Sequence, residues 1–445
     1  MRKVIIFLFV LCLFSPSAFA SYRSFSLKNG LKYYIEEDHR LGIVNITVLY
    51  RVGSYCEYNS ITGIAHMLEH MNFRGSKHFK DGYLDRLSEE FGGVNNAQTS
   101  FDYTMYFITI KKSAYKKALA AYADMMSNLD LNDKRFQKER NVVYQERLWR
   151  IDNSASGFLY YSLHNLAYLA SAYRWTPIGY AYDIKHYDLG DLRRFYKKYY
   201  LPNNAIIVIS GDIDTDSAKK AVEKYFSNKK PADIECRITK EPQQIGRRIM
   251  YIKKPSSMKK LAMGFKIDNA KSRFTPELDL ISYMLFYMKS SMADKDLIRD
   301  KHILSSISGG NEERIHDKGL FEIFADINKN ISFNRARDAI ENELNKIKSG
   351  DFNIDTLNAA KSKAISDYYF SQETLSEKNS SFAFYAAFDM RKYYENYPSI
   401  IKKITKRDIM AAANKYFVKD RESDCFLIPQ KGKIVSNAQY KGGIR

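Results

Sequence analysis

Two histidines and a glutamate stand close together in the segment His66-Met67-Leu68-Glu69-His70. The histidines are four residues apart, so on a helix both imidazoles project from one face. Neutral imidazole nitrogens bind Zn²⁺, and a neighbouring carboxylate can take a proton from water without ligating the metal. The spacing therefore predicts a zinc centre with His66 and His70 as ligands and Glu69 as catalytic base. The alternative is two histidines on a helix surface beside a solvated glutamate.

A catalytic zinc site needs a third protein ligand, and residues 136–151 offer two candidate carboxylates. Glu139 and Glu146 are seven residues apart, about two helical turns, and so lie on one face. They stand beside apolar neighbours, where a buried and unpaired carboxylate would be expensive. A bound metal would remove this cost. The alternative is a pair of solvated helix carboxylates.

The elements that must position these residues follow from the apolar pattern. Alternating residues around Asn29-Gly30 predict a hairpin within residues 22–52. Apolar periodicity predicts helices over 61–73, 83–91, 114–129, 136–151, 189–199 and 216–226, with strands over 105–110 and 204–210.

The second part of the chain repeats this order. Residues 227–246 are polar, contain Pro231 and Pro242, and are typical of a linker. Strands are then predicted over 261–267, 321–327 and 426–429. Tyr-Met-Leu-Phe-Tyr-Met at 283–288 aligns without a gap with His-Met-Leu-Glu-His-Met at 66–71. We therefore expect a zinc-binding domain over 21–226, a linker over 227–246 and a homologous, non-catalytic domain over 247–445.

Length and composition limit the class of protein. A chain of 445 residues exceeds the size of a single core, and 45% apolar with 27% charged residues is ordinary globular composition. The mean hydropathy of −0.43 argues against a multispanning membrane protein. The net charge of +19 raises the possibility of an acidic partner. No basic-aromatic motif accompanies this charge, so we expect no nucleic-acid partner.

The first twenty residues have the pattern of a secretory signal peptide. Two basic residues precede an apolar stretch over 4–14, and Ala18-Phe19-Ala20 forms a small-residue cleavage site. The alternative is an uncleaved N-terminal anchor. Cleavage would leave 425 residues beginning near Ser21. We expect this chain to be exported to the periplasm and to have no stable membrane span.

Three cysteines remain after the signal segment, namely Cys56, Cys236 and Cys425. Their spacing is not that of a metal site, and their odd number does not imply a disulfide framework. We expect three small buried residues, with one disulfide pair as the alternative.

The sequence resembles the pitrilysin/insulinase family of metallopeptidases, whose signature is H-x-x-E-H. The resemblance covers nearly all of the chain beyond the signal segment and is stronger in its first half. It is carried by His66-Met67-Leu68-Glu69-His70, Asn29-Gly30-Leu31, Arg51-Val52-Gly53-Ser54, Gly63-Ile64-Ala65, Gly75-Ser76, Gly92-Gly93, Asn96-Ala97, Thr99-Ser100, Tyr200-Leu201-Pro202-Asn203-Asn204 and Gly211-Asp212.

The resemblance implies a role for each site residue. His66, His70 and Glu146 would hold one Zn²⁺ per chain, and Glu139 would orient a ligand. The stretch containing Asn96 and Ala97 is similar to the family's edge strand, on which an extended peptide substrate pairs.

The second half departs from the family pattern. Arg299 matches a family arginine that contacts substrate, but Ser306 stands where a tyrosine is expected seven residues later. Because some relatives divide these residues between subunits, we expect a dimer. A heterodimer with a zinc-free homologous chain is one form of it.

By this resemblance the fold is α+β, with two homologous domains, each an antiparallel sheet packed by helices, that close like a clamshell. The expected function is zinc-dependent endoproteolysis of unfolded peptides or extended segments outside the cytoplasm. Two alternatives are a non-catalytic scaffold subunit of a peptidase-like complex and a protein that binds acidic polymers or membranes.

Overall fold

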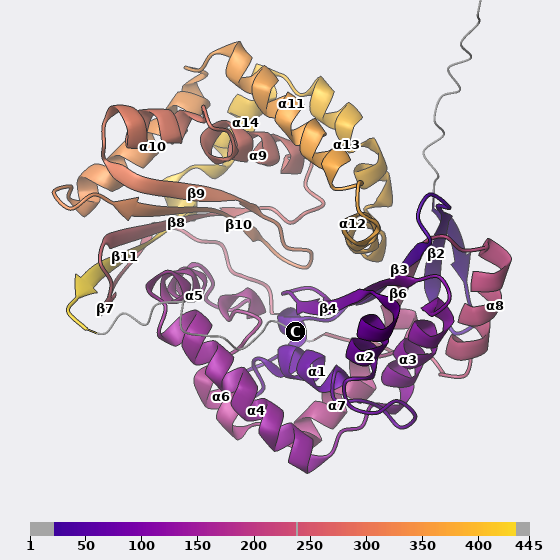
Figure 1. Ribbon diagram of the computed structural model, residues 1–445. Helices are drawn as coiled ribbons and strands as arrows, with labels where there is room; N and C mark the ends of the chain where they lie inside the picture. The colour runs from indigo at the N-terminus through magenta and orange to yellow at the C-terminus, as the bar shows by residue number, and fades with distance from the viewer. Residues whose placement is uncertain (1–21, 237–238, 433–445) are drawn as a thin grey trace, which may run out of the picture.

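The computed structural model describes residues 22–236 and 239–432. The predicted signal peptide over 1–20 and the predicted start of the processed chain at Ser21 lie outside these residues. Two halves, each built on one sheet, face each other (Figure 1). No helix in residues 22–236 or 239–432 combines the length and apolarity needed to cross a membrane.

The first sheet has six strands in the order β1-β2-β6-β3-β5-β4. Their bounds are β1 Arg23–Ser26, β2 Lys32–Glu37, β3 Ile43–Tyr50, β4 Val94–Thr99, β5 Thr104–Lys111 and β6 Ala205–Gly211. The predicted hairpin is present, because β1 pairs antiparallel with β2 across Asn29-Gly30. Strand β4 pairs only with β5 and therefore forms one edge of the sheet.

The helices of the first half follow the predicted pattern with two additions. Their bounds are α1 Ile64–Asn72, α2 Tyr83–Phe91, α3 Tyr115–Asn128, α4 Asp133–Arg147, α5 Ala155–Ala167, α6 Ala181–His186, α7 Leu189–Tyr199 and α8 Thr215–Phe226. The sequence pattern missed helices α5 and α6. Apolar residues of α1, α3, α4, α7 and α8 pack with one face of the sheet in a single core.

The second half contains five strands in the order β7-β11-β8-β10-β9. The strands are β7 Arg248–Pro255, β8 Lys259–Ile267, β9 Leu304–Glu312, β10 Gly319–Ile327 and β11 Glu422–Gln430. The helices are α9 Thr275–Ser282, α10 Phe333–Ser349, α11 Ile354–Phe370, α12 Leu375–Ala387, α13 Arg391–Lys403 and α14 Lys406–Tyr416.

The two sheets share one topology once the extra strand β1 is set aside. In each sheet the strand that comes first in the sequence pairs parallel with the strand that comes last, β2 with β6 and β7 with β11. All other neighbouring strands pair antiparallel. The α+β fold class is therefore confirmed, although each sheet is mixed rather than wholly antiparallel. The parallel pair arises because the last strand of each half returns after several helices and lies beside the first.

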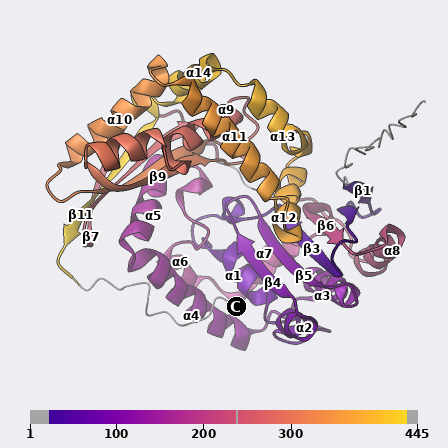
Figure 2. The ribbon, with the colours of Figure 1, turned by 45° about the horizontal axis from the view of Figure 1, so that its top comes forward.

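Each half contributes a helix to the other half's sheet. Helix α5 contacts β7, β8 and β11 of the second sheet, whereas α12 contacts β3, β5 and β6 of the first. Figures 1 and 2 both show α5 against the second sheet and α12 over the first. Phe382 and Ala386 of α12 lie in one apolar cluster with Leu49 and Val208 of the first sheet. Because strand side chains alternate between faces, each sheet buries one face on its own helices and offers the other to the opposite half.

The cysteine prediction was wrong for two of the three residues. Cys56 and Cys236 form a disulfide across a sequence separation of 180 residues, with their Cα atoms 4.9 Å apart. Cys425 is buried and free in β11, as expected. Sequence spacing could not reveal the pair, because only the folded chain brings residues 56 and 236 together.

Candidate metal centre

Helix α1 carries both histidines of the predicted metal site. Its apolar residues Met67 and Leu68 are fully buried, so His66, Glu69 and His70 lie along one side of a helix fixed in the core. Gly63 precedes the helix with a φ of 87°, and a Cβ there would lie 2.4 Å from the carbonyl oxygen of Ile178. Only glycine fits this position, which sets where the helix begins.

Helix α4 carries the two glutamates. Asn132 caps its first turn, accepting a hydrogen bond from the backbone N–H of Arg135. Phe136 and Val143 are fully buried and anchor the helix in the core of the first half. Helices α1 and α4 are in contact, and the glutamates reach the histidines across this contact.

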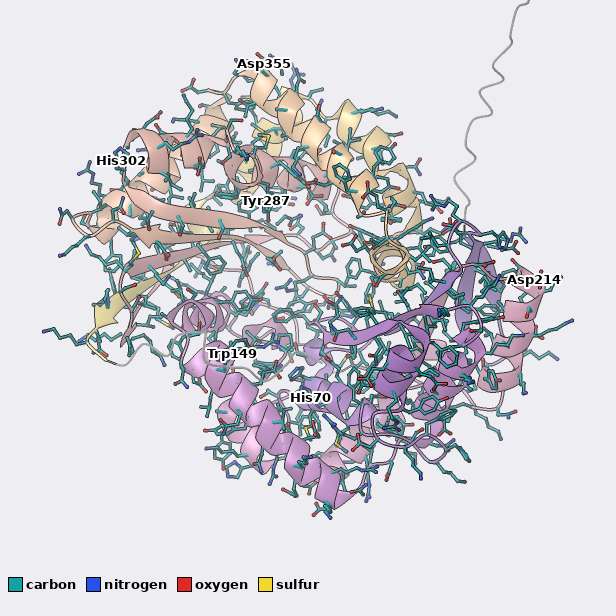
Figure 3. All side chains as sticks on the ribbon, in the orientation of Figure 1. His70, Trp149, Asp214, Tyr287, His302 and Asp355 are labelled. Carbon is teal, nitrogen blue, oxygen red and sulfur yellow. A yellow bond between two sulfur atoms is a disulfide. The ribbon has the colours of Figure 1, made fainter. Side chains whose placement is uncertain are left out.

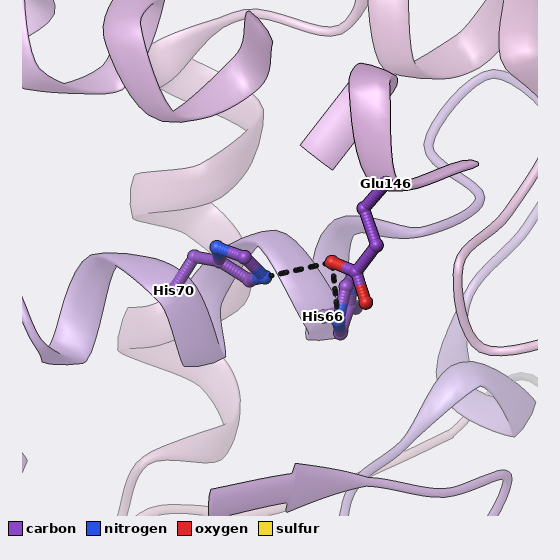
Figure 4. A group of neighbouring side chains, drawn as sticks. All are labelled: His66, His70 and Glu146. Carbon is purple, nitrogen blue, oxygen red and sulfur yellow. Dashed lines mark ion pairs between the residues drawn. The ribbon is translucent and has the colours of Figure 1, made fainter. Parts of the chain in front are cut away.

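Three predicted ligands converge on one point (Figure 4). Atom Oε2 of Glu146 lies 3.3 Å from Nε2 of His70 and 3.7 Å from Nε2 of His66. The two imidazole rings are 4.7 Å apart and nearly perpendicular. Among the described residues, these three form the one group of histidine, cysteine or acidic side chains whose ligand atoms are close enough to share a metal ion.

Neighbouring charges hold two of the predicted ligands in place. Nε of Arg150 contacts Oε1 of Glu146 at 2.7 Å and leaves Oε2 facing the histidines. Glu139 is 1% exposed, and its Oε2 lies 3.4 Å from Nδ1 of His70. Arg74 pairs with the other Glu139 oxygen at 2.8 Å. Glu139 therefore directs the His70 ring so that its Nε2 faces Glu146.

The geometry fits a tetrahedral metal. Ligand atoms bound at about 2.0–2.1 Å in tetrahedral coordination lie roughly 3.3 Å from one another. The separations of 3.3 and 3.7 Å around Glu146 are close to this spacing. Two imidazoles and one carboxylate leave a fourth position open, which is typical of catalytic zinc rather than structural zinc.

The protonation states favour a cation at this point. Burial, aided by the adjacent His70, lowers the pKa of His66 to about 3. Burial also acts to lower the pKa of His70, but its hydrogen bonds with Glu139 and Glu146 raise it to about 9. Burial opposes the ionisation of Glu146, yet the hydrogen bond with His70 and the charge of Arg150 bring its pKa to about 2. Near neutral pH His70 therefore carries a positive charge, at the point where a metal cation would replace its proton.

Glu69 lies beside the trio without joining it. Its side chain is almost buried, and its Oε2 accepts a 2.5 Å hydrogen bond from the hydroxyl of Thr99 at the end of β4. Burial raises the pKa of Glu69, and the Thr99 hydrogen bond opposes that rise. A carboxylate held in this way is suited to proton transfer.

The two predicted residues of the edge strand lie where expected on β4. Asn96 and Ala97 are half-buried and pair with Phe107 and Tyr106 of β5. Oδ1 of Asn96 accepts a hydrogen bond from the N–H of Ala97 at 2.8 Å. Since β4 pairs on one side only, its second edge is available to an extended chain.

Within the described part of the chain, Arg299 contacts residues of its own half and not the predicted metal ligands. It is exposed, pairs with Asp294 at 2.9 Å and donates to the carbonyl oxygen of Lys289. In Figure 3, the nearby His302 lies at the outer end of the second half, far from His70. Ser306 lies on the edge strand β9 and lines a cavity of about 340 Å³.

The second half holds a non-ligating counterpart of the metal site. Tyr283, which aligns with His66, directly follows α9 and donates a hydrogen bond to Oδ2 of Asp367 at 3.0 Å. Asp367 is the fourteenth residue of α11, and Glu146 is the fourteenth of α4. The hydrogen bond between Tyr283 and Asp367 thus takes the place that His66 and Glu146 have in the first half.

Sequence reasoning missed four residues around the site, namely Glu57, Arg74, Thr99 and Arg150. Two of them had a local signal, because Arg74 and Arg150 each lie four residues after a ligand, at His70 and Glu146. Thr99 lies on a different element from Glu69, so its contact follows only from the fold.

Comparison with known proteins gives two family matches that together cover most of the chain. Residues 33–173 match the family described as Insulinase (Peptidase family M16). Residues 186–364 match the family described as Peptidase M16 inactive domain.

Individual relatives cover nearly the whole chain. Zinc protease PqqE from Helicobacter pylori is 34% identical over 420 residues, which cover 93% of this chain and 94% of that protein. The crystal structure of a protease from Helicobacter pylori matches with a TM-score of 0.88 at 34% identity, covering 92% of this chain and 100% of that one. The crystal structure of the periplasmic protease PqqL from Escherichia coli shares the fold, with a TM-score of 0.73, 18% identity and coverage of 92% and 48%.

Proposed function

The chain belongs to the insulinase family, peptidase family M16, and from this premise we propose that it is a zinc-dependent metalloendopeptidase. Its substrates are unfolded peptides or extended segments. The observation that carries the proposal is the convergence of His66, His70 and Glu146 beside a separately held Glu69.

Each residue of the site has a chemical role in peptide hydrolysis. His66, His70 and Glu146 would hold one zinc ion per chain, and Glu139 would orient His70 through Nδ1. Zinc, when bound, supplies a Lewis acid that polarises the scissile carbonyl and lowers the pKa of water. A carboxylate oxygen of Glu69 accepts the proton of the attacking water and returns it to the leaving amine.

The edge strand β4 accounts for a preference for extended substrates. A peptide that adds to its free edge places its backbone alongside Asn96 and Ala97, next to Thr99 and the Glu69 that it contacts. A folded protein seldom offers a free extended backbone of this kind, so unfolded segments are the substrates that fit.

The position of Arg299 supports a dimer. Arg299 is exposed and contacts Asp294 and Lys289 rather than the predicted metal ligands, so we infer that a second subunit brings such an arginine to the substrate. The partner is another copy of this chain or a homologous chain without zinc. The mass of the purified complex distinguishes the two, and a fully active monomer would contradict both.

Residues 1–20 support export, with the periplasm as the compartment. The Cys56–Cys236 disulfide agrees with this assignment, because disulfides persist in oxidising compartments.

The decisive experiment measures zinc content and cleavage of an unstructured peptide for the wild type and Glu69→Gln. We expect about one zinc per chain in both proteins and a loss of turnover of at least about 100-fold in the variant. Glu89→Gln, which changes an exposed glutamate on α2, is the matched control. A wild type that binds zinc but cleaves no peptide would favour the non-catalytic scaffold subunit. A wild type that binds acidic polymers but no zinc would favour a protein that binds acidic polymers or membranes.

A further inference from the structure

The zinc helix α1 begins without a cap from its own N-cap residue. That residue is Gly63, which has no side chain to accept hydrogen bonds from the first turn. Instead, Glu57 reaches the helix from six residues upstream. Its Oε2 accepts from the N–H of Gly63 at 2.7 Å, and its Oε1 accepts from the N–H of Ala65 at 2.9 Å. The two oxygens of this carboxyl group therefore satisfy two free donors at the start of the helix.

Glu57 holds the backbone next to His66, the predicted ligand whose ring is less well anchored by hydrogen bonds. Ala65 directly precedes His66, whose Nδ1 is buried and has no hydrogen-bond partner within the described part of the chain. The second ligand differs, because Glu139 holds His70 through its Nδ1. With no such contact, the orientation of the His66 ring depends on its backbone, and Glu57 fixes that backbone.

The segment that carries Glu57 also supports the strand beside the catalytic base. Residues Ser54–Cys56 form a short 3₁₀ turn, here named the junction turn. The N–H of Ser54 donates to the carbonyl oxygen of Ser100, and the N–H of Tyr55 donates to that of Phe101. These acceptors directly follow Thr99, which contacts Glu69. The junction turn therefore lies between α1 and the end of β4.

A covalent bond fixes the junction turn. Cys56 is its last residue and precedes Glu57, and its disulfide joins it to Cys236 in the segment after α8. Cys236 and the neighbouring Ile234 pack against the core of the first half. The disulfide thus ties the residue next to the helix cap to a part of the chain 180 residues away.

We propose that Glu57 is a positioning residue for the zinc ligand His66, and that the Cys56–Cys236 disulfide holds Glu57 in place. The inference rests on the zinc site proposed above. It adds a device by which formation of one disulfide sets the metal affinity of the site.

The test compares the metal affinity and the metal geometry of variants of the full chain. Glu57→Gln keeps the shape of the side chain but puts an amide N–H where one backbone donor needs an acceptor. Cys56→Ser combined with Cys236→Ser removes the disulfide and leaves Glu57 intact. We expect zinc dissociation constants, measured by chelator competition, to rise about 10- to 100-fold in Glu57→Gln and several-fold in the cysteine variant. The visible spectrum of the cobalt(II) form should change in both.

Two controls separate positioning from general loss of stability. Glu37→Gln alters another glutamate that accepts a backbone N–H at the start of a helix, that of Thr215 in α8. Cys425→Ser alters the buried free cysteine. Both should leave the zinc affinity and the cobalt spectrum unchanged, even where thermal unfolding shifts.

The outcomes distinguish this inference from the proposed function. A wild type that binds no zinc overturns the zinc site itself. A wild type that binds zinc, together with unchanged affinity and an unchanged cobalt spectrum in Glu57→Gln, overturns the positioning role alone. Should Glu57→Gln fail to fold, the cysteine variant decides, and unchanged zinc binding by that variant would overturn the proposal.

Discussion

Asn379 of α12 and Asn45 of β3 lie in different halves of the chain and share a buried hydrogen bond. Nδ2 of Asn379 donates to Oδ1 of Asn45 at 2.7 Å, and Oδ1 of Asn379 accepts from the hydroxyls of Tyr22 and Ser210. Asn379 is completely buried. Since every polar atom of its side chain finds a partner, the network fixes where α12 docks on the first sheet.

Replacing Asn379 by alanine should destabilise the protein. The change removes the acceptor of the buried Tyr22 and Ser210 hydroxyls and one of the two donors to the side-chain oxygen of Asn45, which keeps its hydrogen bond from Thr47. We expect a loss of about 2–3 kcal/mol in the free energy of unfolding, measured by urea denaturation. Asn396→Ala, at an exposed asparagine on α13, should change it by less than about 0.5 kcal/mol. Equal effects of the two substitutions would contradict the role of the network.

The exchange of α5 and α12 predicts that the halves do not fold separately. Residues 22–236 expressed alone, which keep Cys236 for its disulfide with Cys56, would expose the face of the first sheet that α12 covers, including Leu49 and Val208. We expect this fragment to aggregate or to bind a hydrophobic dye, and co-expression with residues 247–445 to restore a soluble complex. A cooperative unfolding transition of the isolated fragment would contradict this expectation.

Replacing Thr99 by valine should move the acid limb of the pH–activity profile to higher pH. Glu69 must be ionised to accept a proton, so kcat/KM falls as the pH drops through its pKa. Burial raises this pKa and the Thr99 hydroxyl lowers it, so removing the hydroxyl raises it further. Gln98→Ala, which alters an exposed neighbour on the same strand, should leave the limb in place. An unshifted limb in Thr99→Val would show that the hydrogen bond does not tune the base.

Zinc binding should release about one proton at pH 7.5. In the metal-free protein His70 has a pKa of about 9 and is protonated, whereas His66, near 3, is neutral and Glu146, near 2, is ionised. A ligating histidine must be neutral, so the metal displaces the proton of His70. Calorimetry in buffers of different ionisation enthalpy measures this number. The part of the release that comes from His70 should decrease as the pH rises through about 9, and no release at pH 7.5 would contradict the assigned protonation states.

Much of the site was predictable because its geometry is local. The four-residue spacing of His66 and His70 places both rings on one face of whichever helix forms, and the apolar pattern around them indicates that helix. The same logic applies to α4, whose predicted start lies near its cap, Asn132. The sequence could propose Glu139 and Glu146 of α4 as candidate ligands, but only the fold separates their roles. Glu146 faces both histidines, whereas Glu139 faces Nδ1 of His70.

The sequence by itself determined the candidate metal-binding residues, their helix faces, the order of most elements and the repeat in the second half, because each depends on spacing along the chain. Tertiary structure alone decided that Cys56 meets Cys236, that Glu57 caps the zinc helix, and that Asn379 docks on Asn45. It also decided that α5 and α12 exchange partners. These contacts depend on distances in space between segments far apart in sequence, and no local pattern encodes such distances.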